Sequence, residues 1–406
     1  MLPCLLQFLR TSRLSRTLLG AAGAATLLLA PLPAAQLHNH TTVFAGGTGS
    51  HYYRIPALIA TSNGTLIAVA EDRVESASDW GNINLVCKRS TNDGATWSAA
   101  TEIVGAGLGS WTNPTLVYDP PGPDLLSIAS RANGRVWLFF NWNNETARSM
   151  DDIGVGDRPT YVCYSDDHGA NWSARVNISA SVTPPTYAWD AIGPGTGIRM
   201  TQAHVGRLVV PATRRNIYSD NHGQSWTYQT IPGGTGESSV VECLGGDLLR
   251  NDRPTASVWE AGAKRRQVSR GTIEGGFPAF TSDNALLDPK CQASILRYNW
   301  AEPDRVIFLN SASTVDDPMQ EGRSKMTVRM SYDDGATWKF SRWLYDWLTV
   351  SQAIAQGKGG YSSMTKTTHA SYPLGVGILV ETNNGTVRSI DFHKVNLEWI
   401  RNGAAD

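Results

Sequence analysis

The sequence predicts an all-β protein built from repeated antiparallel sheets, in the manner of a β-propeller. Three observations predict this class. One eight-residue turn pattern recurs four times, starting at residues 90, 165, 219 and 331. The 406 residues include 39 Gly and 14 Trp, and only 17% are charged, which favours turns and strands over helices. Short alternating apolar runs, separated by Gly, Pro, Asn and Asp, recur throughout the chain.

The repeated turn reads Ser-x-Asp/Asn-x-Gly-x-(Thr/Ser/Asn)-Trp and occupies residues 90–97, 165–172, 219–226 and 331–338. Its Asp or Asn can hydrogen-bond the backbone two residues further on, and its Gly supplies the positive φ of a tight hairpin. The closing Trp is a large apolar plug. Four copies in one register indicate a structural repeat.

The spacing of the turns indicates how many units the chain holds. The starts are 75, 54 and 112 residues apart, so the last gap is close to twice the second. This indicates one unit between 226 and 331 that lacks the signature turn. Roughly 366 residues divided into six units gives about 61 residues each, which four strands and their loops can fill.

The expected strands follow the apolar runs, at 66–70, 135–140, 207–210, 305–309 and 375–380. The run 41–44 is expected to pair with strands near 387–395 and to close the ring, which removes exposed sheet edges. A short helix is expected within 344–356. No linker or composition shift indicates a second folded domain.

The N-terminal stretch has the composition of a targeting segment. Arg10, Arg13 and Arg16 precede the apolar run 18–30, and residues 31–35 offer a small-residue cleavage site. The run is short for a membrane span, so we expect a signal peptide at 1–35 and a single secreted domain at 36–406. A membrane anchor is the alternative.

Cysteines and sequons also bear on secretion. Cys87 and Cys163 lie just before repeat turns, where buried free thiols are expected, and Cys243 with Cys291 is the expected disulfide. Six Asn-x-Ser/Thr sequons are candidate glycosylation sites, at Asn39, Asn63, Asn144, Asn171, Asn177 and Asn384.

The charge and the motifs argue against several partners. Removing 1–35 takes away three Arg and no acid, which changes the net charge from −1 to −4, so neither nucleic acid nor an anionic membrane is an expected partner. The eight His show no zinc-ligand spacing, and no phosphate or dinucleotide loop is present. We expect no metal, no cofactor and a monomer.

One further motif supports a more specific prediction. Tyr53-Arg-Ile-Pro56, followed by the four turns, resembles the secreted exo-sialidases (neuraminidases) of bacteria and fungi, in which such turns are called Asp boxes. The resemblance covers nearly all of residues 41–400. It implies a six-bladed β-propeller and a triad of arginines that grips the carboxylate of a sialic acid.

The resemblance assigns the triad to Arg54, Arg253 and Arg323, with Glu381 orienting Arg54. Arg250 is the rival for the second place, but it falls where the family has an apolar strand residue. Guanidinium groups bind a carboxylate bidentately and stay charged at any working pH. Three of them brought together repel each other, which favours a ligand site over a stabilising feature.

The resemblance also assigns the acid/base to Asp79, in a polar loop before the first Asp box. Asp72 and Glu75 could do the same chemistry but do not match the motif. Arg73 matches an arginine that lines the glycerol side of the sugar pocket.

Tyr361 matches the family nucleophile, and Glu237 matches its base, with Glu242 as a rival in the same segment. A neutral phenol can approach an anomeric carbon that bears a carboxylate, whereas an Asp or Glu nucleophile would be repelled. Sialidases with a Tyr nucleophile are known exceptions to the two-carboxylate rule.

These residues predict a secreted retaining exo-α-sialidase that hydrolyses terminal sialic acids from glycoconjugates through a covalent tyrosyl intermediate. Two alternatives share all of them: a preference for Kdn, the deaminated sialic acid, and a transfer or intramolecular trans-sialidase reaction. An alternative of another class is a non-catalytic Asp-box propeller that binds glycans.

Overall fold

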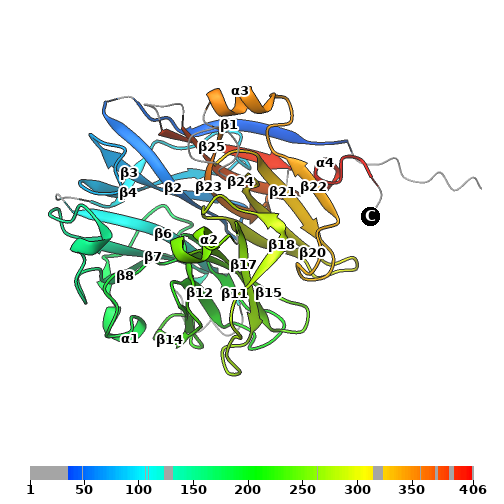
Figure 1. The fold of residues 1–406 in the computed structure, drawn as a ribbon. Coiled ribbons are helices and arrows are strands. Elements are labelled where there is room, and N and C mark those ends of the chain that lie inside the picture. Colours follow the sequence, from blue (N-terminus) through cyan, green and yellow to red (C-terminus); the bar gives the residue numbers. More distant parts are fainter. Residues whose placement is uncertain are drawn as a thin grey trace, which may run out of the picture. The chain divides into compact units, whose positions relative to one another are not determined.

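A computed structural model describes residues 35–404, apart from 48, 106, 108, 123–130, 263, 314–322, 357, 371–373 and 384–387. The residues from Ala35 onward form one compact unit (Figure 1). The expected signal peptide, except for Ala35, and the sequon at Asn384 lie outside the described residues. No helix in the described part is long and apolar enough to cross a bilayer.

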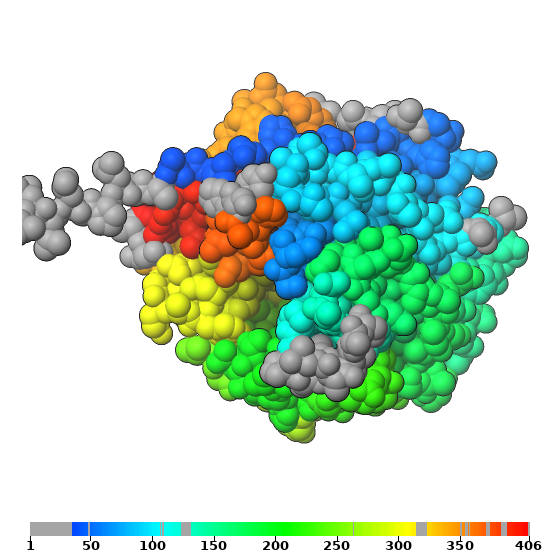
Figure 2. All heavy atoms as spheres, turned by 180° about the vertical axis from the view of Figure 1, so that it is seen from behind, coloured from blue at the N-terminus to red at the C-terminus, as the bar shows by residue number. Residues whose placement is uncertain are grey.

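The first and last segments of this unit share one antiparallel sheet. Its strand order is β1 (His38–Phe44), β25 (Arg388–Val395), β24 (Val376–Asn383) and β23 (Lys358–Lys366). Thr41 pairs with Phe392, and Thr42 Oγ1 donates to Asp391 at 2.8 Å. The predicted pairing of 41–44 with 387–395 is therefore confirmed, and Figure 2 shows the blue N-terminal segment running beside the orange and red C-terminal ones.

Two antiparallel groups follow, joined by a single parallel pair between Ile83 and Ser110. The first group contains β2 (His51–Ala60), β3 (Leu66–Val74), β4 (Ile83–Ser90) and β5 (Thr101–Val104). The second contains β6 (Ser110–Asp119), β7 (Arg135–Asn143), β8 (Thr160–Ser165) and β9 (Val176–Asn177), and β10 (Gly195–Thr196) pairs with β6.

Three four-stranded antiparallel sheets complete the described chain. They contain β11 (Ile198–Arg199), β12 (Leu208–Ala212), β13 (Arg215–Ser219) and β14 (Thr227–Thr230); β15 (Thr235–Glu242), β16 (Leu248–Pro254), β17 (Arg265–Gly271) and β18 (Thr281–Leu287); and β19 (Ser294–Asn299), β20 (Arg305–Ser311), β21 (Met326–Ser331) and β22 (Phe340–Trp343). The sheet β15–β18 fills the long gap between the third and fourth turns, where the spacing predicts a unit without the signature.

The helices are short and lie between strands: α1 (Ser179–Val182), α2 (Ala256–Glu260), α3 (Val350–Ala355), α4 (Leu397–Ile400) and the 3-10 helix η2 (Met150–Asp152). Helix α3 lies within the helix predicted for 344–356. The all-β class predicted from the sequence is thus confirmed.

The four repeat turns share one hydrogen-bond pattern. The Ser Oγ accepts from the backbone N–H of the turn Gly at 2.8 Å in every copy. The Asn or Asp oxygen accepts from the backbone N–H four residues on, at 2.8–2.9 Å, rather than from the predicted position two residues on. Positive φ is adopted by Gly, as predicted, and also by the residue before it, for example 60° at Asp93.

The closing Trp of a turn packs against the preceding sheet. The ring of Trp226 contacts Trp137 and Phe139 of β7, with centroids 5.6 and 4.8 Å apart, and Trp97 contacts Phe392 of β25 at 5.3 Å. These contacts bury large apolar area between neighbouring sheets. The turns therefore act as scaffolding that joins one sheet to the next.

All four described cysteines are buried and free. Cys87 and Cys163 match their predicted state. The predicted disulfide between Cys243 and Cys291 is wrong, because the two thiols lie in different apolar clusters: Cys243 packs with Val241 and Leu249, and Cys291 with Ile55 and Tyr361. Burial raises the pKa of each thiol, to about 12 for Cys243 and about 11 for Cys291.

Candidate active site

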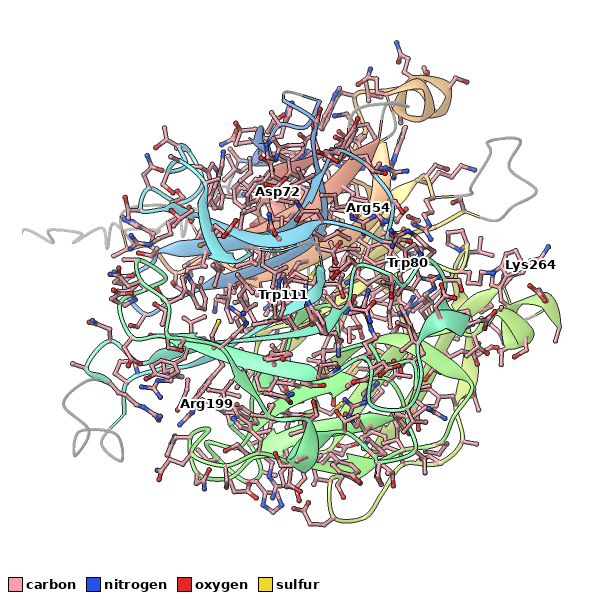
Figure 3. The ribbon with its side chains drawn as sticks, turned by 90° about the vertical axis from the view of Figure 1, so that its left-hand side faces the viewer. Arg54, Asp72, Trp80, Trp111, Arg199 and Lys264 are labelled. Carbon is pink, nitrogen blue, oxygen red and sulfur yellow. The ribbon has the colours of Figure 1, made fainter. Side chains whose placement is uncertain are left out.

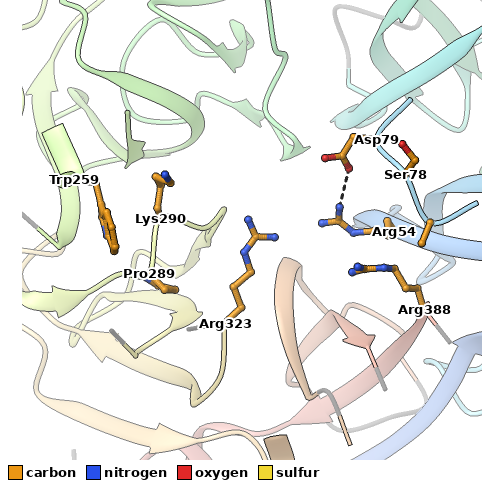
Figure 4. A pocket seen from close by; sticks show the side chains of 9 residues that line it. Arg54, Ser78, Asp79, Trp259, Pro289, Lys290, Arg323 and Arg388 are labelled. Carbon is orange, nitrogen blue, oxygen red and sulfur yellow. Dashed lines mark hydrogen bonds and ion pairs between the residues drawn. The ribbon is translucent and has the colours of Figure 1, made fainter. Parts of the chain in front are cut away.

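The candidate site consists of two adjoining hollows that share Asp79 and Lys290. The larger, of about 660 Å³, is lined by Tyr361, Glu237, Arg253, Arg73 and aromatic residues that include Trp80 and Trp189. The smaller, of about 450 Å³, is lined by Arg54 and Arg323 (Figure 4). The two hollows together thus contain every residue predicted for the site except Glu381. Figure 3 shows Arg54 and Trp80 near one another at this side of the unit.

Arg54 lies on β2 at a bulge that re-aims the strand. The register shifts between Arg54 and Ala57, and Ile55 takes a φ of 54°, which is strained for a β-branched residue. Glu381 of β24 accepts from Arg54 Nε and Nη2 at 3.1 and 3.2 Å. It also accepts from the backbone N–H of Ile55 at 2.8 Å and of Tyr361 at 3.0 Å. One buried carboxylate therefore positions both Arg54 and the backbone of Tyr361.

Arg54 and Glu381 each stabilise the charged form of the other. Burial alone would raise the pKa of Glu381, but Arg54 and the two backbone donors lower it. Burial would likewise lower the pKa of Arg54, but Glu381 and Asp79 raise it. Both groups are therefore charged at neutral pH, and each compensates the burial of the other.

Tyr361, Glu237 and Arg253 form a second hydrogen-bonded group. Tyr361 Oη donates to Glu237 Oε1, and Arg253 Nη1 donates to Glu237 Oε2 at 2.6 Å and to Tyr361 Oη at 2.9 Å. The three residues come from β23, β15 and β16, three strands in two sheets. Burial and the Glu237 carboxylate raise the pKa of Tyr361, while Arg253 and Arg323 oppose the increase. The phenol is therefore neutral, with a base in contact.

Arg323 completes the cluster of cations. Its guanidinium lies 5.5 Å from the centre of the Tyr361 ring, and that of Arg54 lies 5.1 Å from the same centre. Three guanidinium groups thus surround one tyrosine. Arg54 and Arg253 each contact a carboxylate, and Figure 4 shows Arg323 projecting into the hollow between Arg54 and Lys290.

Asp79 sits on the loop after β3 and bridges two arginines. Its Oδ1 accepts from Arg73 Nη1 at 2.6 Å and from Arg54 Nη1 at 3.0 Å, while its side chain stays 66% exposed. Partial desolvation of this carboxylate would raise the pKa of Asp79, but Arg73 and Arg54 lower it to about 2. Arg73 is held from behind by Glu71, at 2.7 and 2.9 Å.

The alternative candidates for the triad, the acid/base and the base of the tyrosine lie elsewhere. Arg250 is fully buried and pairs with Asp252, and Asp72 accepts from His51 at 2.7 Å. Glu242 accepts from the backbone of 201–203. Glu75 is absent from the lining of both hollows. The geometry therefore separates Arg253, Asp79 and Glu237 from their rivals.

Gln292 is a supporting residue that the sequence did not reveal. Its amide nitrogen donates to the carbonyls of Ser362 and Pro194, at 2.9 and 3.1 Å, and its oxygen accepts from the Ser362 N–H at 2.8 Å. The carbonyl of Gly193 in turn accepts from the N–H of Ser238 at 2.7 Å. One buried amide thus links the backbone next to Tyr361 with the backbone next to Glu237.

Among the described residues, no group of three or more His, Cys, Asp or Glu side chains could hold a metal ion. The site itself offers arginines, carboxyl groups and a tyrosine. The arginines can hold an anion, and the hydrogen-bonded tyrosine and carboxylates can exchange protons.

Comparisons with known proteins bear on this chemistry. The model of the BNR repeat-like domain family matches residues 105–376. The chain is 39% identical to an exo-alpha-sialidase of Aspergillus fumigatus, over 88% of the chain and 87% of that protein. It is 37% identical to an exo-alpha-sialidase of Arthroderma benhamiae, over 91% and 92% of the two chains.

Solved structures resemble the fold as well. A leech intramolecular trans-sialidase aligns with a TM-score of 0.73 at 18% identity, over 90% of this chain and 71% of that one. A Hadza microbial sialidase aligns with a TM-score of 0.70 at 24% identity, over 89% and 69%. These two likenesses concern the fold.

Proposed function

The chain belongs to the exo-α-sialidase family, and we propose that it is a retaining enzyme that releases terminal sialic acids from glycoconjugates through a covalent intermediate on Tyr361. The observation that carries this proposal is the contact of a buried tyrosine hydroxyl with Glu237 and Arg253, next to Arg54 and Arg323.

The arginines supply recognition of the substrate. Arg54, Arg253 and Arg323 all approach Tyr361, so an anion bound between them would lie against the phenol. A carboxylate attached directly to the reacting carbon would be held in place by such a cluster, with bidentate hydrogen bonds to the guanidinium groups. Among sugars, sialic acids carry a carboxylate on the anomeric carbon.

Tyr361 supplies the nucleophile. Its oxygen would attack the anomeric carbon while its proton passes to Glu237, which already accepts a hydrogen bond from it. Because burial and Glu237 hold the pKa of Tyr361 high, the phenol stays neutral until attack begins. A neutral nucleophile avoids repulsion by the substrate carboxylate. Because Arg253 donates to both groups, it stabilises the negative charge as this moves from Glu237 to the Tyr361 oxygen.

Asp79 supplies the acid and then the base. With a pKa of about 2 it is ionised at neutral pH, so it must gain a proton when substrate binds. A substrate carboxylate at Arg54 would compete for the guanidinium that Asp79 now contacts, and would add a negative charge nearby. Both effects raise the pKa of a carboxyl group, so binding itself would prepare Asp79 to protonate the leaving oxygen. The same group would then activate water.

We also propose that the sheets form a six-bladed β-propeller. The strands β2–β5 and β6–β9, counted as two blades, join the other four sheets to give six. Among the described strands, the pairing of Ile83 with Ser110 is the one strand-to-strand pairing between those two groups. The sheet that contains both β1 and β25 would be the blade that closes the ring.

We further propose that the protein is exported after cleavage near residue 35 and acts as a monomer on sialylated glycans. The basic and apolar composition of the first 35 residues supports export. Five sequon asparagines, Asn39, Asn63, Asn144, Asn171 and Asn177, are exposed and available for glycosylation.

The decisive experiment compares aryl α-glycosides of Neu5Ac and Kdn, with the products identified by NMR. We expect the first product to be the free sugar in the α-configuration, which is the signature of retention. A preference for one sugar, a 2,7-anhydro product or a transfer product would identify which of the alternatives applies. Absence of turnover on both glycosides would overturn the proposed function.

A further inference from the structure

Several cationic side chains line the smaller hollow. Its lining includes Arg54, Arg323, Arg388 and Lys290, and Asp79 is the one acid in that lining. Asp79 already contacts both Arg54 and Arg73. Figure 4 shows Arg388 beside Arg54 on one side of the hollow, and Lys290 with Trp259 on the other. Lys290 therefore adds a positive charge to the wall of the hollow opposite Arg54.

Lys290 is held at this wall by its backbone and by an indole ring. It takes a φ of 62°, a left-handed conformation that a lysine adopts at a cost. Its ammonium lies 5.4 Å from the centre of the Trp259 ring, a distance that permits a cation–π contact. Trp259 Nε1 donates to the carbonyl of Asp288 at 3.0 Å, which fixes the indole against the same turn.

The neighbouring carboxylate faces away from Lys290. Asp288 is fully buried, and its oxygens accept from Arg266 Nη1 at 3.0 Å and from the backbone of Cys291 at 2.9 Å. The Asp288 carboxylate is therefore hydrogen-bonded to groups of the interior. The charge of Lys290 is directed to the two hollows that it lines.

The position of Asp79 indicates what part of a substrate would meet Lys290. Asp79 lines both hollows, so the oxygen that it protonates would lie at their junction. The sugar that is attacked would occupy the larger hollow, against Tyr361, with its carboxylate reaching Arg54 and Arg323 in the wall of the smaller one. The leaving group would then extend into the smaller hollow, towards Trp259 and Lys290.

From this geometry we propose that the smaller hollow is a leaving-group subsite that favours an acidic aglycone, with Lys290 as its specificity-determining residue. The aglycone would be a sugar that bears a second anionic group, a carboxylate or a sulfate, close to the scissile bond. The proposal rests on the sialidase function proposed above.

The test uses substrate pairs that differ in one charge. The first pair is an α2,3-sialyl-N-acetyllactosamine with and without a 6-O-sulfate on its galactose. The second is an α2,8-linked disialoside with its inner carboxylate free or converted to an amide. We expect kcat/KM to be about fivefold higher for the charged member at low salt, the effect of one partly screened ion pair. At 0.5 M NaCl the ratio should approach one.

Two variants identify the residue responsible. Lys290→Gln should bring the ratio close to one, with each rate normalised to the same variant's hydrolysis of an aryl sialoside. Lys264→Gln is the matched control, because Lys264 lies 5.7 Å from the centre of the same indole but is not part of the lining of either hollow. Figure 3 shows it at the outer edge of the unit. The control should keep the wild-type ratio.

The outcomes separate the two proposals. A wild-type protein that hydrolyses the aryl sialoside but treats both members of each pair alike would overturn the acidic subsite and leave the sialidase function standing. A preference that persists in Lys290→Gln would also overturn it. A preference for only one pair would identify whether sulfate or carboxylate is the group recognised. Failure on the aryl sialoside itself would instead overturn the proposed function.

Discussion

Strand β16 carries two arginines, Arg250 and Arg253, that the protein uses in opposite ways. Arg250 is fully buried and donates to Asp252, Asn216 and two backbone carbonyls. Arg253, three residues on, contacts Glu237 and Tyr361 at the wall of the larger hollow. The first has its hydrogen-bonding capacity taken up by the fold. The two hydrogen-bond partners of the second, Glu237 and Tyr361, both line the hollow.

The contrast extends to other arginines of the interior and the site. Arg215 pairs with Asp190 at 2.6 and 2.8 Å, and Arg266 pairs with Asp288, all of them fully or almost fully buried. These pairs join strands and loops of the sheets and have internal partners. Around Tyr361, by contrast, three guanidinium groups converge. A cluster of guanidinium groups that lines a hollow is suited to an anionic ligand, whereas a matched buried pair is suited to holding sheets together.

The largest expected effect is the loss of activity in Tyr361→Phe. The variant keeps the ring and the ion pair between Glu237 and Arg253 but lacks the attacking oxygen. We expect kcat on an aryl sialoside to fall by at least about 10³-fold, and the free energy of unfolding to change by no more than about 1 kcal/mol. Turnover assays and urea denaturation of the same preparation measure both. Near-normal hydrolysis would remove Tyr361 from the role of nucleophile.

The next prediction compares the two arginines of β16 directly. Arg250→Met leaves Asp252 buried without its main partner, so we expect about 3–5 kcal/mol of destabilisation. Arg253→Met should change stability far less, because its site is open to the hollow, but should raise KM for sialosides and lower kcat. Urea midpoints together with steady-state kinetics separate the two patterns. Equal destabilisation by both substitutions would contradict the division between interior and site.

The sequence allowed local features to be predicted better than distant ones. The four turns could be placed because their hydrogen bonds join residues at most four positions apart. Arg54 and its partners were found through motifs shared with a known family, and spacing alone would not have grouped them. The pairing of Cys243 with Cys291 failed because the sheet that holds each thiol is decided by tertiary packing.

Gln292 shows the same limit. Its partners, Pro194 and Ser362, lie 98 and 70 residues away in the chain, and a single glutamine in a short turn carries no recognisable signal. Lys290 is similar, because its exposure to both hollows depends on the turn between β18 and β19. Such residues become visible only when the strands are placed side by side.

The smallest expected effect concerns acid stability and the carboxyl groups of the two regions. Partial desolvation would raise the pKa of Asp79, but Arg73 and Arg54 lower it from 3.8 to about 2. Its contribution to stability is therefore present above about pH 4 and is lost as the pH falls through about 2. Burial raises the pKa of Asp252 despite Arg250, so Asp252 has the opposite sign and does not add to this loss. Since the Asp79 side chain is 66% exposed, solvent screening should keep its contribution below about 1 kcal/mol.

Asp79→Asn should therefore flatten the dependence of stability on pH between about 4 and 2, by an amount that 0.5 M NaCl reduces. Urea midpoints of wild type and variant at half-unit intervals of pH, with and without salt, measure the difference. Titration of a buried carboxyl group of the interior would instead change the stability in a different pH range, and added salt would reduce that change little. Parallel profiles for the two proteins would mean that the ion pairs of Asp79 contribute nothing measurable to folding. In that case the charged groups that line the hollow would contribute to ligand binding and not to stability, unlike the buried ion pairs of the interior.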